Sequence, residues 1–253
     1  MMRFENKHAV VTGGASGIGR AIALRLGEEG ANVHLFDRDA SAAASVVAEI
    51  ESVGGRARVH EVDVASSASV SAAMSSIEQI DVLVNSAGIA AIGNLEATTP
   101  DEMDRIFAVN VKGVYLCMRE ALPKLSASAS GVILNLASIA SHVGIQDRFA
   151  YSMSKGAVLS MTLSVARDYL AAGVRCNCIS PARVHTPFVD SYLDRNYPDN
   201  RQEMFDKLAA YQPIGRMGTP AEIAGLAAYL CSEEAAFVTG AAYGIDGGVI
   251  NLR

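Results

Sequence analysis

The chain has 253 residues, of which 50% are hydrophobic and 19% are charged, which is enough to bury the core of one α/β domain covering residues 1–253. Its formal net charge is -6 and it has no run of basic residues, which argues against a nucleic-acid partner. No apolar stretch reaches the ~20 residues that span a bilayer, and the first residues lack the apolar core of a signal peptide, so we expect a soluble, cytoplasmic protein without a membrane partner.

Short apolar, β-branched runs alternate with alanine-rich stretches of helical period from one end of the chain to the other. The predicted strands cover residues 8–12, 32–36, 58–62, 82–85, 132–136, 174–179 and 242–245. The predicted helices cover residues 18–29, 40–53, 67–77, 101–124, 151–172 and 221–231. This alternation predicts an α/β fold, a doubly wound parallel seven-stranded sheet with helices on both faces, known as a Rossmann fold.

Two helix starts carry a clear signal, since Thr99-Pro100 and Thr219-Pro220 each offer an N-cap residue followed by proline at the first helical position. Residues 187–212 differ from the rest because their helical pattern is interrupted and rich in tyrosine and proline. We interpret this segment as an inserted helical flap that closes over substrate.

The cysteines give no sign of a metal site. Cys176 and Cys178 alternate along a predicted strand, where both thiols point to one side and behave as small buried hydrophobic groups. No histidine or carboxylate cluster accompanies them at zinc-like spacing, so we expect no metal.

A glycine-rich turn, T-G-G-A-S-G-I-G from residue 12 to residue 19, joins the first predicted strand to the first predicted helix. Glycines allow a tight turn and a close backbone approach to a pyrophosphate, whose charge the helix N-terminus receives. An ordinary strand-to-helix connection is the alternative, but this turn opens the first βαβ unit. The expected cofactor contacts in the turn are Gly13, Ser16, Gly17, Ile18 and Gly19.

Asp37 ends the second predicted strand, eighteen residues after Gly19, where a carboxylate can bind the adenine ribose hydroxyls. Its negative charge repels the 2′-phosphate of NADP and accepts both hydroxyls of NAD, so NAD is favoured. Arg38 beside it can stack on the adenine or soften the repulsion, which keeps NADP as the alternative.

Tyr151 and Lys155 are four residues apart in a predicted helix, so a phenol and an ammonium lie on one face. A phenol titrates near pH ~10 and accepts a proton at neutral pH only when a positive charge stabilises its anion, which Lys155 can supply. This spacing also arises by chance on surface helices. With Ser138 upstream as a hydroxyl donor, the pair predicts the proton-handling half of a hydride-transfer site.

Together these motifs resemble the short-chain dehydrogenase/reductase family in its single-domain form, over essentially the whole chain. The glycine turn matches the family's T-G-x-x-x-G-x-G, Ser138 its catalytic serine, and Tyr151 with Lys155 its Y-x-x-x-K. The resemblance adds cofactor and catalytic positions, namely the pair Asp63-Val64, the N-N-A-G turn written here as Asn85-Ser86-Ala87-Gly88, and the helix asparagine Asn110.

After the sixth strand the family usually shows P-G, whereas this chain reads P-A-R-V-H-T from residue 181 to residue 186. The resemblance implies cofactor contacts from Pro181, Val184 and Thr186, the last meeting the nicotinamide carboxamide. Arg183 and His185 are unusually polar for a pocket that binds a fatty substrate, and this variant is similar to one in sugar-oxidising members. The ending around residues 244–248 matches the family's last strand and implies a homotetramer.

The resemblance implies that Tyr151 removes the alcohol proton while hydride leaves the same carbon, that Lys155 lowers the tyrosine pKa and holds the nicotinamide ribose, and that Ser138 donates to the developing carbonyl. Asn110 then anchors a water that relays the proton. Arg148, one helical turn before Tyr151, can face the substrate, although a solvated arginine is an equal alternative. With Ser138 and Tyr151, the candidate substrate contacts are Arg148, Arg183 and His185, with Gln146, Tyr192 and Arg216 as weaker ones.

An arginine-bearing pocket suits a small polar substrate, and the resemblance is nearest to enzymes acting on L-fucose or 2-keto-3-deoxy-L-fuconate. Three alternatives stay open. A 3-oxoacyl-carrier-protein reductase usually prefers NADP and needs a basic surface, which this chain lacks. A 3-hydroxybutyrate-type dehydrogenase would also have a polar pocket, and a non-catalytic cofactor-binding scaffold would be expected to have lost Ser138, Tyr151 or Lys155.

Overall fold

One continuous parallel sheet organises the computed structural model, which describes residues 2–252. The strands are β1 (His8–Thr12), β2 (Asn32–Asp37), β3 (Arg56–Glu61), β4 (Val82–Asn85), β5 (Val132–Leu136), β6 (Arg175–Pro181) and β7 (Ala242–Ile245). Their spatial order, β3-β2-β1-β4-β5-β6-β7, reverses direction between β1 and β4. The predicted doubly wound seven-stranded sheet is therefore confirmed, and a ligand crevice belongs at the carboxyl ends of the strands beside this reversal.

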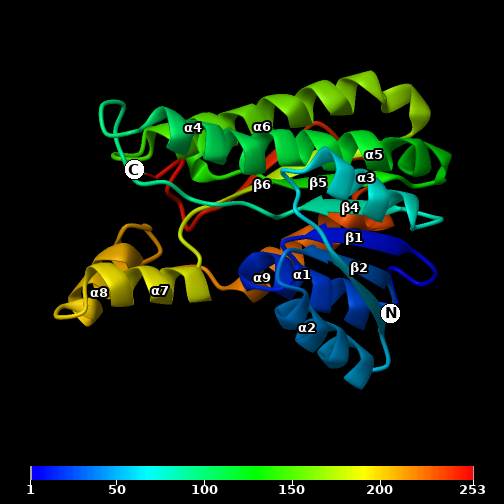
Figure 1. Ribbon diagram of the computed structural model, residues 1–253, viewed down its shortest axis with the longest axis horizontal. Helices are drawn as coiled ribbons and strands as arrows, with labels where there is room; N and C mark the ends of the chain where they lie inside the picture. Colours follow the sequence, from blue (N-terminus) through cyan, green and yellow to red (C-terminus); the bar gives the residue numbers. More distant parts are fainter. Residues whose placement is uncertain (1, 253) are drawn as a thin grey trace.

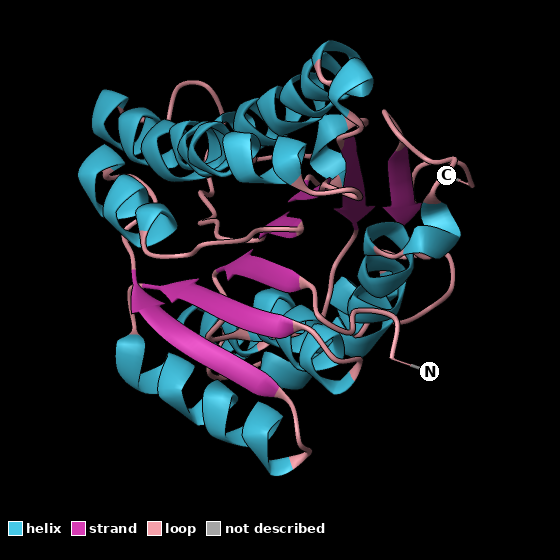
Figure 2. Ribbon diagram, turned by 90° about the vertical axis from the view of Figure 1, so that its right-hand side faces the viewer, coloured by secondary structure: helices cyan, strands magenta, loops and turns pink. Residues whose placement is uncertain are grey.

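Helices cover both faces of the sheet (Figures 1 and 2). They are α1 (Gly17–Glu28), α2 (Ala40–Ser52), α3 (Ser67–Ser75), α4 (Pro100–Phe107), α5 (Gly113–Ala127), α6 (Phe149–Asp168), α7 (Pro187–Asn196), α8 (Arg201–Ala210) and α9 (Pro220–Cys231). Figure 1 shows α1, α2 and α9 on one face and α3 to α6 on the other. Within the described residues, no helix is long and apolar enough to cross a membrane.

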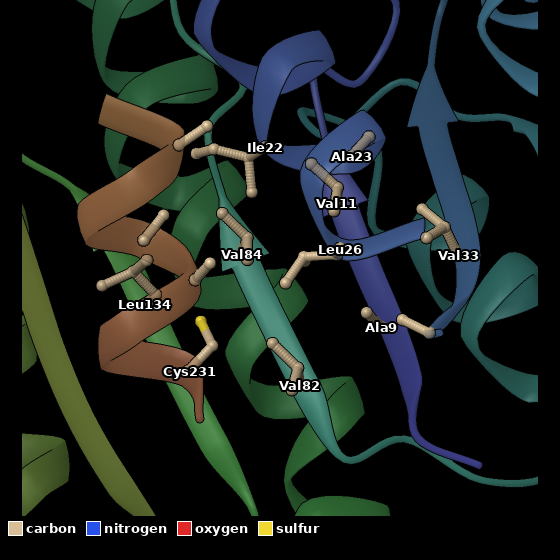
Figure 3. Packing of buried hydrophobic residues seen from close by; sticks show 14 of the residues in the cluster. Ala9, Val11, Ile22, Ala23, Leu26, Val33, Val82, Val84, Leu134 and Cys231 are labelled. Atoms are coloured by element: carbon tan, nitrogen blue, oxygen red, sulfur yellow. The ribbon is translucent and has the colours of Figure 1, made fainter. Parts of the chain in front are cut away.

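The central strands are apolar on both sides because helices cover both faces. On β1, Val11 packs into the cluster beneath α1 and α9, whereas its neighbour Val10 packs into the cluster beneath α3 and α5. Figure 3 shows Ile22 and Leu26 of α1 meeting Val84 of β4 in the first cluster. Burial on both faces fixes the register of β1, β4 and β5, and with it the level at which each strand ends.

Most elements differ by one or more residues from their predicted bounds, and two of these differences have a clear physical cause. β3 begins at Arg56 and ends at Glu61 instead of covering residues 58–62, because its backbone pairs with β2 from Arg56 onward. A prediction based on apolar residues does not include a charged residue such as Arg56 in a strand at the edge of the sheet. The predicted helix 101–124 is divided into α4 and α5 by a π-helical turn at Ala108–Lys112. Such turns often occur at functional sites, and this one contains Asn110.

Both predicted Thr-Pro helix starts are confirmed. The Thr99 side chain accepts a hydrogen bond from the backbone N–H of Glu102 at 3.2 Å. Thr219 and Glu222 form a reciprocal capping box at the start of α9. These caps fix the first turns of α4 and α9.

The segment predicted as a flap, residues 187–212, contains two helices, α7 and α8, with Leu193 of α7 fully buried. In Figure 1 both helices stand apart from the two helical layers. Because α7 follows β6 closely, the segment lies at the carboxyl end of the sheet, where the ligand crevice is expected. Closure over substrate stays a prediction.

A row of three histidines crosses the sheet, from His8 on β1 through His34 on β2 to His60 on β3. The ring nitrogens His8 Nδ1 and His34 Nε2 are 3.2 Å apart, and His34 Nδ1 and His60 Nε2 are 3.1 Å apart. In each contact one nitrogen donates and the other accepts, so a neutral His34 donates once and accepts once. Burial, followed by the charges of His60, His8 and Arg58, lowers the pKa of His34 from 6.5 to about 4. The ring of His34, at the centre of the row, is therefore neutral near pH 7.

We expect the free energy of unfolding to decrease as the pH falls from about 6.5 to about 4. In this window the unfolded chain binds a proton on His34 while the folded chain does not, so acid favours unfolding. The lowered pKa of His34 corresponds to a change of at most about 3 kcal/mol in the free energy of unfolding. We expect a change of about 2 kcal/mol, because the ring keeps some contact with solvent. Urea denaturation of His34→Gln near pH 7 and pH 4.5 should show a weaker pH dependence than the wild type, with His142→Gln, outside the row, as the control. Equal pH dependence in His34→Gln and the wild type would contradict this assignment.

Candidate active site

The glycine turn between β1 and α1 is closed by contacts that leave no room for side chains. Gly13 has a φ of 65°, and a Cβ there would lie 2.9 Å from the Cα of Ala87. A Cβ at Gly19 would lie 2.1 Å from the carbonyl oxygen of Gly13. The Thr12 hydroxyl oxygen accepts hydrogen bonds from the N–H groups of Ser86 and Ala87, at 3.1 and 3.0 Å. The turn is thereby tied to the segment after β4 across the point where the strand order reverses.

Asp37 lies at the end of β2 beside this turn. Its carboxylate accepts hydrogen bonds from the backbone N–H of Ala15 at 3.0 Å and of Asp39 at 3.1 Å. These two bonds fix the carboxylate at the edge of the crevice, while neighbouring Arg38 is exposed. A carboxylate held next to the turn can accept the hydroxyls of an adenine ribose.

A cavity of about 290 Å³ runs from the glycine turn to the catalytic candidates. A dinucleotide fits its wall, because bare backbone lines the turn and the N-terminus of α1 faces an approaching phosphate. Thr186 stands across the cavity from the turn, since a Cβ at Gly17 would lie 3.5 Å from its methyl carbon. Twelve predicted residues line the cavity: Gly13, Ser16, Gly17, Ile18, Gly19, Ala87, Gly88, Ser138, Tyr151, Lys155, Pro181 and Thr186.

Other predicted cofactor residues lie outside this cavity. Asn85 is buried below it, and its side-chain amide donates to the side-chain oxygen of Asn135 at 2.8 Å. The Asn85 side chain thus ties β4 to β5, and a contact of Asn85 with the cofactor stays a prediction. Val184 is also buried, and its backbone pairs with Gly218. Asp63 is exposed and Val64 is buried, and their contacts with the cofactor stay predictions.

Tyr151 and Lys155 lie on the first half of α6, and Ser138 lies just after β5. The Lys155 ammonium nitrogen is 5.8 Å from the centre of the Tyr151 ring and donates to the carbonyl oxygen of Leu136 at 2.7 Å. The Ser138 hydroxyl oxygen accepts the Ala140 N–H at 3.2 Å, which fixes the serine at the start of a short 3-10 turn. All three side chains line the same cavity.

Burial has the largest effect on the pKa of both Tyr151 and Lys155. It raises the pKa of Tyr151, while a hydrogen bond with Ser138 and the positive charge of Arg148 lower it. Burial also lowers the pKa of Lys155 from 10.5 to about 8. The structure thus adds Arg148 to the predicted pair, as a cation that favours the phenolate.

Asn110 lies in the π-helical turn, and protein groups occupy its side chain. The amide nitrogen donates to the carbonyl oxygen of Ile89 at 2.9 Å and to the hydroxyl oxygen of Ser154 at 3.1 Å. The amide oxygen accepts the Ile89 N–H at 2.8 Å. One amide hydrogen therefore bonds the loop after β4 and the other bonds Ser154 of α6, so the side chain supports that wall of the site, and the water predicted at Asn110 stays a prediction.

A second cavity, of about 160 Å³, opens beside the first. Ala90, Ser138, Tyr151 and Phe188 line both cavities, so the two meet at the reactive hydroxyls. Arg148 and Arg183 line the second cavity, as do the aromatic side chains of Tyr192 and Tyr211. This arrangement places a substrate-sized space directly against the Tyr151 hydroxyl.

His185 is not in this space. Its ring is exposed, contacts Asp190 at 3.1 Å and lies edge-on to Phe205 in α8. Asp190 of α7 thus holds the ring away from the lining of the second cavity, and the substrate contact of His185 stays a prediction. Among the weaker candidates Tyr192 lines the second cavity, while Gln146 is exposed and Arg216 forms an ion pair with Glu222.

Sequence reasoning missed the apolar wall of the second cavity. It consists of Ala90, Ile92, Ile139, Ile145, Phe188 and Val189, which come from three separate loops and helix starts. In the sequence each of these looks like an ordinary apolar residue. In the structure two of them stand out, because Ile92 and Phe188 stay 52% and 60% exposed despite their size.

Comparisons with known proteins agree with this geometry. The family model described as Enoyl-(Acyl carrier protein) reductase matches residues 13–250. The 2-(S)-hydroxypropyl-CoM dehydrogenase 3 of Xanthobacter autotrophicus is 39% identical, with 98% of each chain covered. The 2-keto-3-deoxy-L-fuconate dehydrogenase of Xanthomonas campestris is 34% identical, over 98% of this chain and 82% of the relative.

A solved structure is similar over nearly the whole fold. It is L-sorbose reductase from Gluconobacter frateurii complexed with NADPH and L-sorbose, with a TM-score of 0.94, 29% identity, and coverage of 99% of this chain and 98% of the other. Both relatives are named as dehydrogenases, and the solved neighbour is a sugar reductase with a nicotinamide cofactor bound. The chain belongs to the short-chain dehydrogenase/reductase family.

Proposed function

We propose that this protein interconverts a secondary alcohol and a ketone on a small polar substrate such as a hydroxy acid or a sugar acid, with NAD as its cofactor. One observation carries the proposal: Tyr151 and Ser138 line both cavities at the point where the two meet. A dinucleotide beside the glycine turn and an alcohol in the second cavity would thus approach the same two hydroxyls.

In this proposal the substrate alcohol gives its proton to the Tyr151 phenolate, and the Ser138 hydroxyl donates to the oxygen that becomes the carbonyl. The dinucleotide, when bound, supplies the two-electron oxidant. The Lys155 ammonium over the tyrosine ring and the Arg148 guanidinium favour the phenolate by their positive charge. Lys155 lies beside Gly88 and Asn110 within the first cavity, which suits contact with a nicotinamide ribose.

The choice of NAD rests on Asp37. Its fixed carboxylate can accept two ribose hydroxyls and would repel a 2′-phosphate. The related L-sorbose reductase was solved with NADPH, so family membership does not determine the cofactor. The choice between NAD and NADP therefore rests on Asp37.

The proposal is tested by following reduced nicotinamide in absorbance, with NAD and NADP in parallel and a panel of sugars, sugar acids and short hydroxy acids as substrates. Turnover of at least one small polar alcohol with NAD is expected. Activity confined to a steroid or to an acyl-carrier-protein substrate would refute it.

We expect Asp37→Asn to raise kcat/KM for NADP about 10-fold and to lower that for NAD. The amide oxygen of asparagine can still accept the Ala15 N–H, whereas its amide nitrogen cannot accept the Asp39 N–H, so the change removes the charge and keeps the bond to the glycine turn. Asp39→Asn is the matched control, because it removes the same charge two residues later while keeping an N-cap acceptor for α2. An unchanged NAD/NADP ratio in Asp37→Asn, or an equal change in Asp39→Asn, would contradict the role of Asp37.

A further inference from the structure

The lining of the second cavity combines two kinds of side chain. Its apolar wall is the set of six side chains described above, namely Ala90, Ile92, Ile139, Ile145, Phe188 and Val189. The lining also includes Arg148 and Arg183 with the phenols of Tyr192 and Tyr211, and among the described residues no carboxylate lines the space. A substrate in this cavity therefore meets both hydrocarbon and positive charge.

The two arginines come from independently anchored segments. The backbone of Arg148 pairs with that of Gly93, and its guanidinium donates to the carbonyl oxygen of Ala91 at 3.3 Å, a neutral acceptor. The guanidinium of Arg183, on the loop after β6, stacks over the Tyr211 ring at 5.0 Å from its centre. Burial raises the pKa of Tyr192 and so does its neighbour Tyr197, while the positive charges of Arg148 and Arg183 oppose the rise, so both guanidinium groups lie near that phenol. Their charges thus converge near Tyr192.

The size and the apolar wall limit what else the substrate can carry. The second cavity, of about 160 Å³, is little more than half the volume of the first, of about 290 Å³, which favours a short substrate. Substrate methyl and methylene groups gain by contact with the isoleucines Ile92, Ile139 and Ile145. A row of hydroxyls would instead lose its water against the same side chains without finding acceptors there.

Resting on the proposed function, we infer that the substrate is a short aliphatic hydroxy acid whose anionic group lies between Arg148 and Arg183 and whose alkyl carbons lie against the isoleucine wall. A carboxylate and a sulfonate share the required charge and planar or forked oxygens for guanidinium recognition. A polyhydroxylated sugar acid would pair with the arginines, but its hydroxyls would find no hydrogen-bond acceptors on the isoleucine side chains. Charge and alkyl length, rather than hydroxyl pattern, then set the specificity.

The test compares kcat/KM of the wild type, with NAD, for four compounds: 3-hydroxybutyrate, 2-hydroxypropanesulfonate, the neutral 1,3-butanediol and a 3-deoxy sugar acid. The better of the two short anions should exceed both the diol and the sugar acid by about 100-fold. The ratio of the two anions identifies carboxylate or sulfonate as the preferred group. A higher kcat/KM for the diol or for the sugar acid would overturn the inference.

The arginines are tested by Arg148→Gln and Arg183→Gln. Each should raise KM for the short anion at least about 10-fold and lower the ratio of kcat/KM for the short anion to kcat/KM for the neutral diol at least about 10-fold, a change in preference that a folding defect would not produce. Arg195→Gln is the matched control, because Arg195 is an exposed arginine on α7 outside the cavity lining. Unchanged anion preference in both variants would overturn the inference.

Different outcomes of these assays would refute the proposed function and the inference about the substrate. If no compound of the panel is oxidised, the proposed function fails, and the inference fails with it. If only neutral alcohols or polyhydroxylated acids are oxidised, the proposed function stands and the inference alone is refuted.

Discussion

Tyr151→Phe is expected to lower kcat about 1000-fold, a loss of about 4 kcal/mol in transition-state stabilisation, with little change in NAD binding. The variant removes only the hydroxyl that accepts and returns the proton. The phenyl ring can keep its place beneath Lys155, whose ammonium is tied to the Leu136 carbonyl independently of the tyrosine oxygen. Single-turnover kinetics would measure the chemical step, and NADH fluorescence titration would measure cofactor binding.

The matched control is Tyr229→Phe, which removes a phenol oxygen from α9, outside both cavities. It should keep kcat within about twofold of the wild type, because surface changes away from special features have small effects. A Tyr151→Phe enzyme with kcat near the wild-type value would show that another group transfers the proton.

The cofactor half of the site was predictable because its signals are local. The turn from β1 to α1 needs glycine at fixed positions for backbone reasons, and the four-residue spacing of Tyr151 and Lys155 is a property of one helix. Each signal can be read in a short window of sequence. The alternation of strands and helices then brings these windows to one edge of the sheet.

The substrate half was only partly predictable because its walls come from distant loops. Arg183 and His185 are two residues apart, so sequence treats them alike, yet only Arg183 reaches the cavity. The deciding contacts are the Tyr211 ring, which stacks on Arg183, and Asp190, which binds His185. Both contacts depend on how α7 and α8 fold back, which an interrupted helical pattern does not determine.

The roles of two buried amides, Asn85 and Asn110, were likewise not predictable from the sequence. Both fit family positions, but their roles depend on partners far away in sequence, namely Asn135 for Asn85 and Ile89 with Ser154 for Asn110. A buried amide must satisfy its hydrogen bonds somewhere, and sequence does not say where. In both cases the amide supports the wall of the site from behind.

Gly19→Ala is expected to weaken NAD binding at least 100-fold and to lower the melting temperature by several degrees. The added Cβ would lie 2.1 Å from the Gly13 carbonyl oxygen and 2.8 Å from its carbonyl carbon. Both atoms belong to backbone, so no side-chain rotation can relieve the overlap. Overpacking of this kind costs about 1–3 kcal/mol, and relief requires the turn to open where a pyrophosphate must bind.

The turn cannot open freely, because contacts on both sides hold it. Thr12 accepts two N–H groups from the segment after β4, and Asp37 accepts the Ala15 N–H. The strain should therefore displace the Asp37 carboxylate as well, so that affinity for NAD falls more than stability alone would explain. Isothermal titration with NAD and thermal denaturation, carried out on the same sample, separate the two effects.

Gly225→Ala supplies the control, because Gly225 lies in the interior of α9 with no atom within 4 Å of its added Cβ. Alanine should stabilise that helix by about 0.5–1 kcal/mol and leave NAD binding unchanged. If Gly19→Ala instead bound NAD within about threefold of the wild type, the close approach of Gly19 to Gly13 would not be what shapes the dinucleotide cavity.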